Sequence, residues 1–424
     1  LRRQRQMCIR DSSCMKKHYV WNKNFTLLVI GQIISLFGNA MLRFSLSLYV
    51  LDTTGSASAF ATILAISMIP TILLSPVGGV LADRMSRRHI MILLDCFTGF
   101  LLLSFTYLIT QASSLALVAI TMIILSIIQS FYQPAVQASI PLLVDEEKLM
   151  QANGITVQVN ALATLLGPIL GGVLFSLLPF ATLLIISAAC FLFSSLLECI
   201  MQIPFVPQKR KDTFLKSTWQ DLKAGMQFVY RDRPTLFKLL MILALLNFIL
   251  SSLMSVGLPV ISNITLALDP VYFGWLQAGI GIGSIIGAML LPIFQKRFQL
   301  AHSYIFLMLA SLFLFPIGLA IMFLNSVYVS YAIVFAASIL CMAFAAIFNI
   351  YAQTYLQHNT PNEMLGKVSS FVTMIVMCTY PLGQAVYGVL FDVLDALPYL
   401  IFMVAAFISI GISLRCRSIL KVIE

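Results

Sequence analysis

The stretch LALVAITMIILSII, residues 115–128, decides the fold class because it is apolar on every face of a helix. A strand of a membrane barrel would instead alternate polar and apolar side chains over about ten positions. Lipid offers the backbone no hydrogen-bond partner, so a segment of this kind crosses a membrane as a helix. The stretch therefore predicts an all-α polytopic membrane protein rather than a soluble domain.

Eleven further segments share this apolar character. The chain of 424 residues is 60% hydrophobic and only 10% charged, against roughly 25% charged in an ordinary globular protein. At ~20 residues per crossing, the apolar residues suffice for about a dozen spans. We expect twelve transmembrane helices at residues 25–50, 57–81, 88–110, 115–137, 151–178, 180–203, 236–262, 271–294, 303–324, 327–350, 369–391 and 398–414.

The placement of Lys and Arg predicts the orientation of these spans. Of the 26 Lys and Arg residues, 25 lie in the two tails and in alternate connections, and the connections between them contain none. This is the positive-inside distribution of a membrane protein, so the net charge of +10 requires no nucleic-acid partner. We expect both termini to be cytoplasmic.

One half of the chain resembles the other. A shift of 216 residues aligns Gly167 and residues 172–175 with Gly383 and residues 388–391. The same shift places the fifth span on the eleventh. We expect two pseudo-repeated six-helix bundles that face each other across a substrate site near the middle of the membrane, as in transporters built from repeats.

The repeat divides the chain into five predicted parts. These are a cytoplasmic tail (1–24), a first bundle (25–203), a cytoplasmic linker (204–235), a second bundle (236–414) and a cytoplasmic tail (415–424).

The first tail and the linker each carry a separate expectation. Residues 1–14 resemble translated sequencing-adapter sequence and lack the apolar core of a secretory signal, so we expect the natural chain to begin at Met15. In the linker, apolar residues from Leu215 to Val229 recur at helical spacing between polar ones, which predicts an amphipathic helix at the membrane surface. This helix is either a passive tether or a regulatory element.

Cysteine, histidine and acidic residues form no catalytic or metal-binding pattern. The eight Cys include no CxxC pair, and the four His and sixteen Asp and Glu are dispersed along the chain. Metal sites and enzyme active sites need such groups close together, and no GxxxxGK[ST] phosphate loop is present. We therefore expect no metal, no cofactor, no enzymatic activity and no direct use of ATP.

The connection after the second span, GVLADRMSRR at residues 79–88, resembles the signature cytoplasmic loop of the major facilitator superfamily, GxLaDrxGrr. It departs from that pattern at Ser86, where glycine is usual. The resemblance implies the twelve-helix fold and a latch that holds the outward-open state. A simple positive-inside anchor would explain the arginines but not the aspartate. The implied latch residues are Gly79, Asp83, Arg84, Arg87 and Arg88.

The fifth span contains ATLLGPILGG, residues 163–172, which resembles the antiporter motif gxxxGPxxGG of exporting members of that superfamily. Proline removes a backbone hydrogen bond, and the glycines allow another helix to approach closely. A purely structural kink is the alternative. The residues that carry the resemblance are Gly167, Pro168, Gly171 and Gly172.

Five further segments resemble the drug:proton antiporter-3 subfamily, which contains macrolide-efflux and enterobactin-exporter proteins. They are IGQIISLFG (30–38), YVLDTTGS (49–56), QPA (133–135), LV (143–144) and NTPNEMLGKV (359–368). One departure is that many drug–proton antiporters carry an arginine in the fourth span, where this chain has only Gln129 and Gln133 as polar amides. Proton coupling through an arginine of the fourth span is therefore not available to this chain.

Two ionisable residues lie clearly inside predicted spans, where a charge costs ~2.5–3.5 kcal/mol on insertion scales. Asp95 is the candidate for proton coupling, since binding a proton removes its charge; the alternative is an aspartate that reaches the arginines of the nearby loop. Arg43 either binds an anionic substrate or is satisfied by carbonyl groups and water. Each lies ~10 Å from a different membrane surface, so we expect no direct pair between them.

Amide and phenol groups predict a polar lining for the substrate cavity. Asn39 precedes Arg43 by one helical turn, so both lie on one face of the first span. The other candidates for the cavity are Gln129, Gln133, Asn160, Asn247, Gln277, Asn349 and Tyr380. Five acids near span ends are expected to be interfacial and receive no role: Asp52, Glu198, Asp269, Asp392 and Asp395.

Together these patterns predict a secondary active exporter in a bacterial cytoplasmic membrane. It would expel amphipathic compounds such as macrolide-like drugs in exchange for protons by alternating access, working as a monomer in the lipid bilayer. The alternatives are a siderophore or metabolite exporter and a proton-coupled uptake carrier of the same fold. A membrane enzyme and a pure channel fit the pattern less well.

Overall fold

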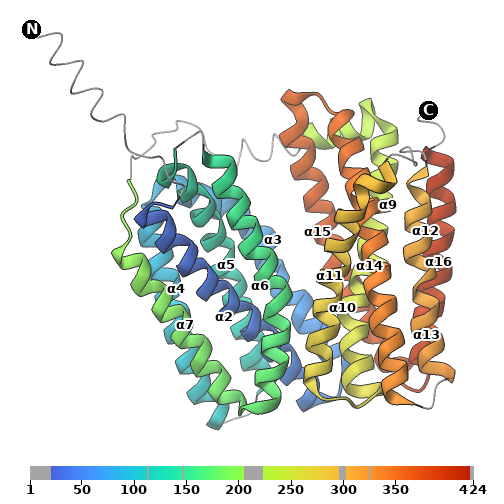
Figure 1. Ribbon diagram of the computed structural model, residues 1–424, viewed down its shortest axis with the longest axis horizontal. Coiled ribbons are helices and arrows are strands. Elements are labelled where there is room, and N and C mark those ends of the chain that lie inside the picture. The colour runs from blue at the N-terminus through green and yellow to red at the C-terminus, as the bar shows by residue number, and fades with distance from the viewer. Residues whose placement is uncertain are drawn as a thin grey trace, which may run out of the picture.

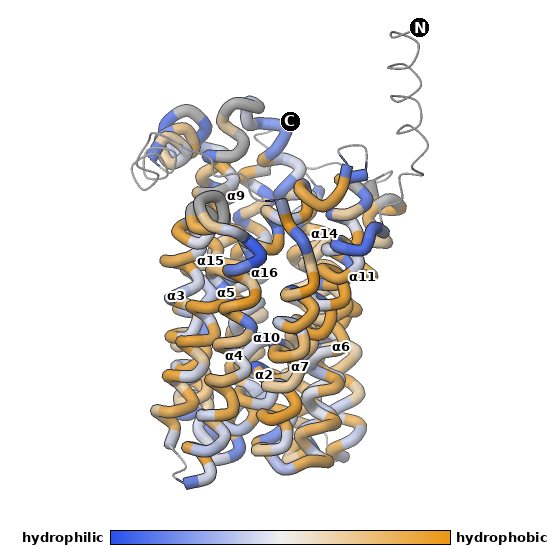
Figure 2. The backbone as a smooth tube through the Cα atoms, turned by 90° about the vertical axis from the view of Figure 1, so that its left-hand side faces the viewer, coloured by the Kyte–Doolittle hydropathy of each residue, from blue (hydrophilic) through white to orange (hydrophobic). Residues whose placement is uncertain are grey.

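Twelve helical segments cross the thickness of the protein. The computed structural model describes residues 21–111, 114–145, 148–204, 223–295, 302–323 and 326–420. Within these ranges, twelve segments are long and apolar enough to span a membrane, and they coincide with the twelve predicted spans. Their middles are mainly hydrophobic, while hydrophilic residues concentrate toward the two ends (Figure 2). The predicted all-α transmembrane fold is confirmed.

The first bundle contains six helices. In chain order they are α2 (Lys23–Thr54), α3 (Ala57–Arg84), α4 (Arg87–Gln111), α5 (Leu115–Leu143), α6 (Leu149–Leu177) and α7 (Phe180–Ile200). Helix α2 packs against α6 and α7, α3 against α5, and α4 against both α5 and α7. Local sequence sets where two of these helices begin, because the side chains of Asn22 and Ser56 cap the first turns of α2 and α3.

The second bundle also contains six spans, two of which are interrupted. Its elements are α9 (Pro234–Leu246), η3 (Asn247–Ser251), α10 (Ser252–Pro259), η4 (Val260–Thr265), α11 (Pro270–Gln295), α12 (Tyr304–Leu312), α13 (Leu314–Phe323), α14 (Val327–His358), α15 (Asn362–Val393) and α16 (Pro398–Leu420). The run from α9 to η4 is one span with two π-helical segments, and α12 and α13 form another. A short π-helix, η2 (Phe228–Asp232), precedes α9.

Several expectations fall on parts of the chain that lie outside the described residues. The first is the expected start of the natural chain at Met15, together with the residues before it. The second is residues 205–222, which hold most of the linker and of its predicted amphipathic helix. The described end of the linker packs closely on α15, because a Cβ atom at Gly225 would lie 2.6 Å from the carbonyl oxygen of Lys367.

The two bundles meet at one end of the protein. Helix α6 packs on α11, and α3 packs on α15. A Cβ atom at Gly172 would lie 2.8 Å from the carbonyl oxygen of Pro270, and one at Gly388 would lie 3.0 Å from that of Ala57. We call this the closed end. Toward the other end, where α2 begins and α16 ends, the bundles diverge (Figure 1).

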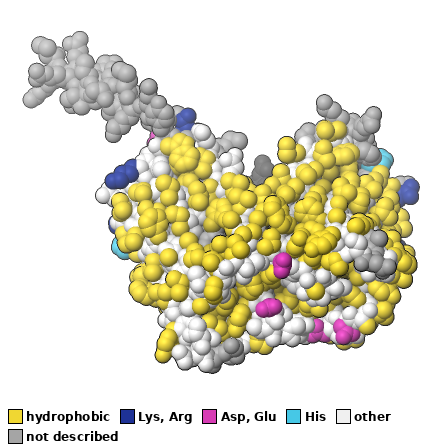
Figure 3. All heavy atoms as spheres, turned by 60° about the horizontal axis from the view of Figure 1, so that its bottom comes forward, with side chains coloured by type: hydrophobic (Ala, Val, Ile, Leu, Met, Phe, Trp, Pro, Cys, Tyr) yellow, Lys and Arg dark blue, Asp and Glu magenta, His cyan; other side chains and the backbone are white. Residues whose placement is uncertain are grey.

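Acidic side chains gather at the closed end (Figure 3). Asp392, expected only to be interfacial, joins the two bundles here. Its carboxylate, at the end of α15, accepts hydrogen bonds from the backbone N–H groups of Ala57 (2.7 Å) and Ser58 (3.2 Å) and from the Ser56 hydroxyl (2.7 Å). The first turn of a helix has unpaired N–H groups and a partial positive charge, both of which an anion satisfies. An acid of the second bundle therefore caps a helix of the first.

Replacing Asp392 by Asn should weaken the closed end. The substitution removes the negative charge, and a helix cap contributes ~1 kcal/mol, so the ratio of closed to open molecules should fall about fivefold. Distances between spin labels on the ends of α3 and α15 would measure this ratio. Asp395→Asn is the matched control, because that exposed carboxylate accepts only from the adjacent Ala396 N–H among the hydrogen bonds described. Identical distance distributions in Asp392→Asn and the wild type would contradict the cap.

Candidate functional site

A central cavity of about 430 Å³ lies between the two bundles. Helices α2, α3 and α6 form one wall, and α10, α11 and α15 form the other. Its polar lining consists of Asn39, Arg43, Ser47, Ser67, Asn160, Thr164, Ser255, Gln277, Tyr380 and Gln384. Phe and Leu side chains fill much of the remainder, so the cavity suits an amphipathic molecule.

Arg43 is the one charged side chain among the residues described as lining this cavity. Its guanidinium donates from Nε to Asn39 Oδ1 (3.2 Å) and from Nη1 and Nη2 to the hydroxyl of Ser126 (both 3.3 Å). These partners are neutral, and the described lining of the cavity contains no Asp or Glu, so no acid of the cavity wall balances the charge of Arg43. A guanidinium has five N–H donors, so some of them remain for a substrate. As expected, Arg43 and Asp95 do not form a pair. Arg43 lines the central cavity, whereas Asp95 is buried elsewhere in the first bundle.

The facing wall carries a polar network that the sequence reasoning missed in part. The amide of Gln384 donates to the Ser255 hydroxyl at 3.0 Å, and the predicted residue Tyr380 lies within hydrogen-bonding reach of both. Gln384 and Ser255 were not among the cavity candidates. The available signal for Gln384 was the same one that selected Gln277, namely an amide within an apolar span.

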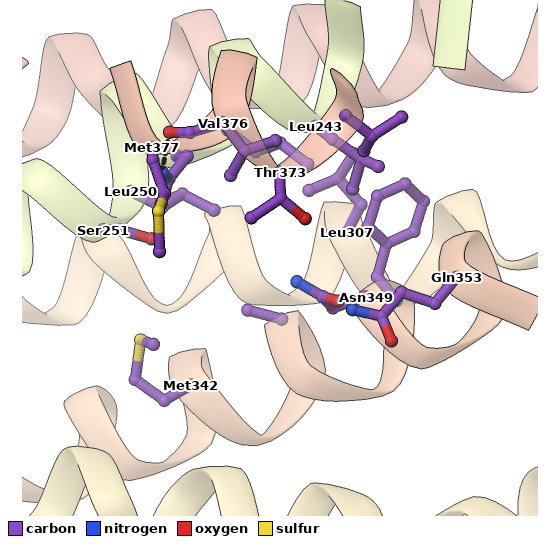
Figure 4. A pocket seen from close by; sticks show the side chains of 15 residues that line it. Leu243, Leu250, Ser251, Leu307, Met342, Asn349, Gln353, Thr373, Val376 and Met377 are labelled. Atoms are coloured by element: carbon purple, nitrogen blue, oxygen red, sulfur yellow. Dashed lines mark hydrogen bonds between the residues drawn. The ribbon is translucent and has the colours of Figure 1, made fainter. Parts of the chain in front are cut away.

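A second cavity of about 290 Å³ lies within the second bundle, one helical turn from the central one along η3 and α15. Thr373 of α15 lies on one side of it and Asn349 and Gln353 of α14 on the other (Figure 4). At its edge, Asn247 donates to the carbonyl oxygen of Val376 at 2.7 Å. Asn247 begins the π-helical segment η3, and such segments recur at functional sites in helices.

The predicted cavity residues are thus distributed over three places. Five of them line the central cavity: Asn39, Arg43, Asn160, Gln277 and Tyr380. Asn247 and Asn349 line the second cavity. Gln129 and Gln133 are half-buried on α5 and belong to the lining of neither cavity.

Asp95 lies inside the first bundle, away from both cavities, and only 2% of it is exposed. Its carboxyl lies within hydrogen-bonding reach of the hydroxyls of Ser194 and Tyr132. Of the arginines in the α3–α4 connection, Arg88 is not its partner, because the Arg88 side chain donates to the backbone carbonyls of Glu198 and Cys199 at the end of α7. For the other arginines of the connection, the alternative of an aspartate paired with the loop stays a prediction.

Glu198 was expected to be interfacial, and the structure corrects this. Its side chain is only 2% exposed, and Oε1 accepts a hydrogen bond from the Tyr132 hydroxyl at 2.9 Å. The chain leaving α7 packs at the start of α2, where Met201 is fully buried and the Gln202 N–H donates to Asn24 Oδ1. A position two residues from the end of a helix does not reveal these contacts.

The latch predicted from the α3–α4 connection is described only in part. The side chains of Gly79, Asp83 and Arg84 lie outside the described part of the chain, although α3 itself continues to Arg84. Arg88 binds backbone carbonyls at the end of α7, as stated above. The latch stays a prediction.

The antiporter-like motif of α6 lies between two helices. Cβ atoms at Gly167 and Gly171 would collide with Ala40 and Phe44 of α2, whereas one at Gly172 would collide with the start of α11. The glycines therefore let α6 pack closely on its own bundle and on the other one. Pro168 lies beside them and lines the central cavity.

Comparison with known sequences identifies relatives over most of the chain. A family model described as Major Facilitator Superfamily matches residues 28–384. Macrolide efflux protein A of Streptococcus pyogenes is 27% identical over 376 residues, which cover 87% of this chain and 89% of that protein. Enterobactin exporter EntS of Salmonella choleraesuis is 29% identical over 325 residues, which cover 74% of this chain and 72% of that protein.

Solved transporter structures share the fold. A bacterial homologue of the iron transporter ferroportin in an inward-facing state superposes with a TM-score of 0.70 at 17% identity, covering 92% of this chain and 98% of that chain. The nucleoside transporter NupG gives a TM-score of 0.72 at 14% identity, covering 95% and 100%. At these identities the likeness concerns the fold alone.

Replacing Gly172 by Ala should push α6 away from α11. The added Cβ would lie 2.8 Å from a backbone carbonyl oxygen, which cannot move aside as a flexible side chain can. We expect spin labels on the ends of α6 and α11 to report fewer closed molecules. Gly154→Ala on the same helix is the control, since nothing lies within 4 Å of a Cβ at that position. Equal effects of the two substitutions would show that helix propensity, rather than the contact with α11, is responsible.

Proposed function

Because the chain belongs to the major facilitator superfamily, and is a transporter rather than an enzyme, we propose that it exports amphipathic small molecules in exchange for protons by alternating access. The family expected from the α3–α4 connection and the fifth-span motif is confirmed by this match. The proposal assigns to this chain the export function for which its relatives are named.

The observation that carries the proposal is a central cavity between two bundles that are joined at only one end of the described structure. We place the closed end outside the cell, because the sequence puts Lys and Arg in the connections at the other end. The cavity then faces the cytoplasm, where an exporter takes up its substrate. Both cavities are complete within one chain, which supports a monomer as the transport unit.

Export is favoured over uptake by two features. The relatives are named as efflux and exporter proteins, and Gly172 of the antiporter-like motif packs α6 on the other bundle at the closed end. An inward proton gradient would supply the driving force, with Asp95 as the candidate proton carrier. A proton-coupled uptake carrier of the same fold is the alternative, and the direction of transport separates the two.

Accumulation of a radiolabelled macrolide and of a fluorescent dye in drug-sensitive bacteria tests export. Cells that express the protein should accumulate less of at least one compound, because export opposes entry, and a protonophore should restore accumulation. Asp83→Asn should abolish the effect if the latch is needed for turnover, whereas the control Asp395→Asn should not. Greater accumulation in expressing cells would instead favour uptake.

Arg43 favours a second candidate, the export of an anionic siderophore or metabolite. A unit charge held ~5 Å from the guanidinium at an effective dielectric constant of ~20 interacts by ~3 kcal/mol. This energy attracts an anion and repels a cation, and the cavity lining described here contains no acid that would offset it. A cationic drug would therefore bind less well in this cavity than an anionic compound of similar shape.

Binding of a catecholate siderophore and of a cationic macrolide to the purified protein tests this substrate class. Arg43→Gln should lower the affinity for the anion by ~100-fold, the equivalent of the energy above, and should raise that for the cation. Arg43→Lys keeps the charge and should retain most of the anion affinity. If Arg43→Gln leaves both affinities unchanged, Arg43 has a structural role only.

A further inference from the structure

A polar cluster is buried inside the first bundle, outside both cavities. Asp95 of α4 and Glu198 of α7 are each 2% exposed, and Tyr132 of α5 is 3% exposed. The Tyr132 hydroxyl donates to Glu198 Oε1 at 2.9 Å and also lies within hydrogen-bonding reach of Asp95 and of Ser35 on α2. One hydroxyl oxygen therefore lies between two carboxyl groups.

The groups that act on Asp95 and Glu198 in the described structure include no Lys or Arg. Arg88, on the same helix as Asp95, binds the backbone carbonyls of Glu198 and Cys199. Asp95 Oδ2 and Glu198 Oε2 are buried without a hydrogen-bond partner. A buried carboxylate is costly unless it is paired, and two that share a site cannot both ionise readily.

We propose that Asp95, Tyr132 and Glu198 form a proton-binding site in which the two carboxyl groups hold one proton, and that this proton is the coupling ion of the exporter. The second part of the proposal rests on the proposed function; the first does not. Tyr132 accounts for the sharing, because a hydroxyl accepts one hydrogen bond while it donates another.

The transfer within the site is balanced. When Asp95 carries the proton, its O–H donates to the Tyr132 oxygen, and the Tyr132 O–H donates to the Glu198 carboxylate. Movement of the Asp95 proton to Tyr132, together with movement of the Tyr132 proton to Glu198, leaves Asp95 ionised and Glu198 neutral. The net charge of the cluster stays at −1 throughout this transfer.

Helix α2 connects this cluster to the central cavity. Ser35, within reach of Tyr132, precedes Asn39 by one turn and Arg43 by about two. One turn before Ser35, both polar atoms of the Gln32 side chain are buried without a partner, while the carbonyl of Gly31 accepts from Ser194. Loss of the proton would leave two negative charges between α4 and α7. Helix α7 packs directly on α2, and α4 packs on α7. A change of charge in the cluster would thus act on the helix that carries Arg43.

The second bundle shows that packing does not require these acids. The 216-residue shift places Ser311, Phe348 and Leu414 at the positions of Asp95, Tyr132 and Glu198. None of the three carries an ionisable carboxyl, and Ser311 and Phe348 are buried as their counterparts are. The cluster is therefore a feature of the first bundle alone.

Infrared absorption of protonated carboxyl groups tests the proton site without any substrate. The full-length wild type at neutral pH should show a buried carboxylic acid band that Asp95→Asn/Glu198→Gln removes and Asp395→Asn keeps. Tyr132→Phe leaves both carboxyls in place and should shift the frequency of the band, because one hydrogen bond to the acid is lost. A wild type without such a band, or a band that neither change affects, would overturn the site.

Transport in proteoliposomes tests the coupling role. For whichever probe the wild type carries, the macrolide or the catecholate siderophore, Glu198→Gln should retain exchange across the membrane without a gradient but lose accumulation driven by a pH gradient. Retained gradient-driven accumulation would overturn the coupling role and leave the proposed function standing. If the wild type carries neither probe, the proposed function fails for those substrates, and the infrared result alone decides the proton site.

Discussion

The absence of hydrogen-bond partners in lipid is the constraint on which the rest of this structure depends. It forces every span into a helix, so that the backbone satisfies itself. Many hydroxyls in the spans are satisfied within their own helix, as when Thr98, Ser130 and Ser139 each donate to the carbonyl four residues earlier. The polar groups that cannot do this stand out: an uncompensated guanidinium, two buried carboxyls and the amides of Gln32 and Gln384.

The contacts between the bundles obey the internal repeat, whereas the ionisable groups do not. Gly172 and Gly388, which the 216-residue shift aligns, both allow a helix of one bundle to touch the start of a helix in the other. Closure of one end is therefore nearly symmetric. Arg43, Asp95 and Glu198 all belong to the first bundle, while the second contributes the amides and hydroxyls of α10, α11, α14 and α15. The symmetric part of the protein is suited to movement and the asymmetric part to recognition.

Substrate and proton would use separate groups in this arrangement. The cavity carries a positive charge and the buried cluster carries carboxyls, and α2 contacts both. Ser35 and Arg43 are eight residues apart, or ~12 Å along the helix. Coupling between the two sites would then depend on how α2 packs in the protonated and deprotonated states, rather than on competition for one residue.

The sequence by itself determined the twelve spans, the family and the individual candidates Asp95 and Arg43, because hydropathy, short motifs and the cost of a charge in lipid are properties of local segments. It also selected five residues that line the central cavity, since each is polar within an apolar span. Only the tertiary structure decided that Gln129 and Gln133 lie outside both cavities, that Asp392 caps a helix of the other bundle, and that Glu198 is buried beside Asp95 and Tyr132. These three outcomes depend on which helix faces meet and on which side chains pack beside one another, and both are set by contacts between residues far apart in the sequence.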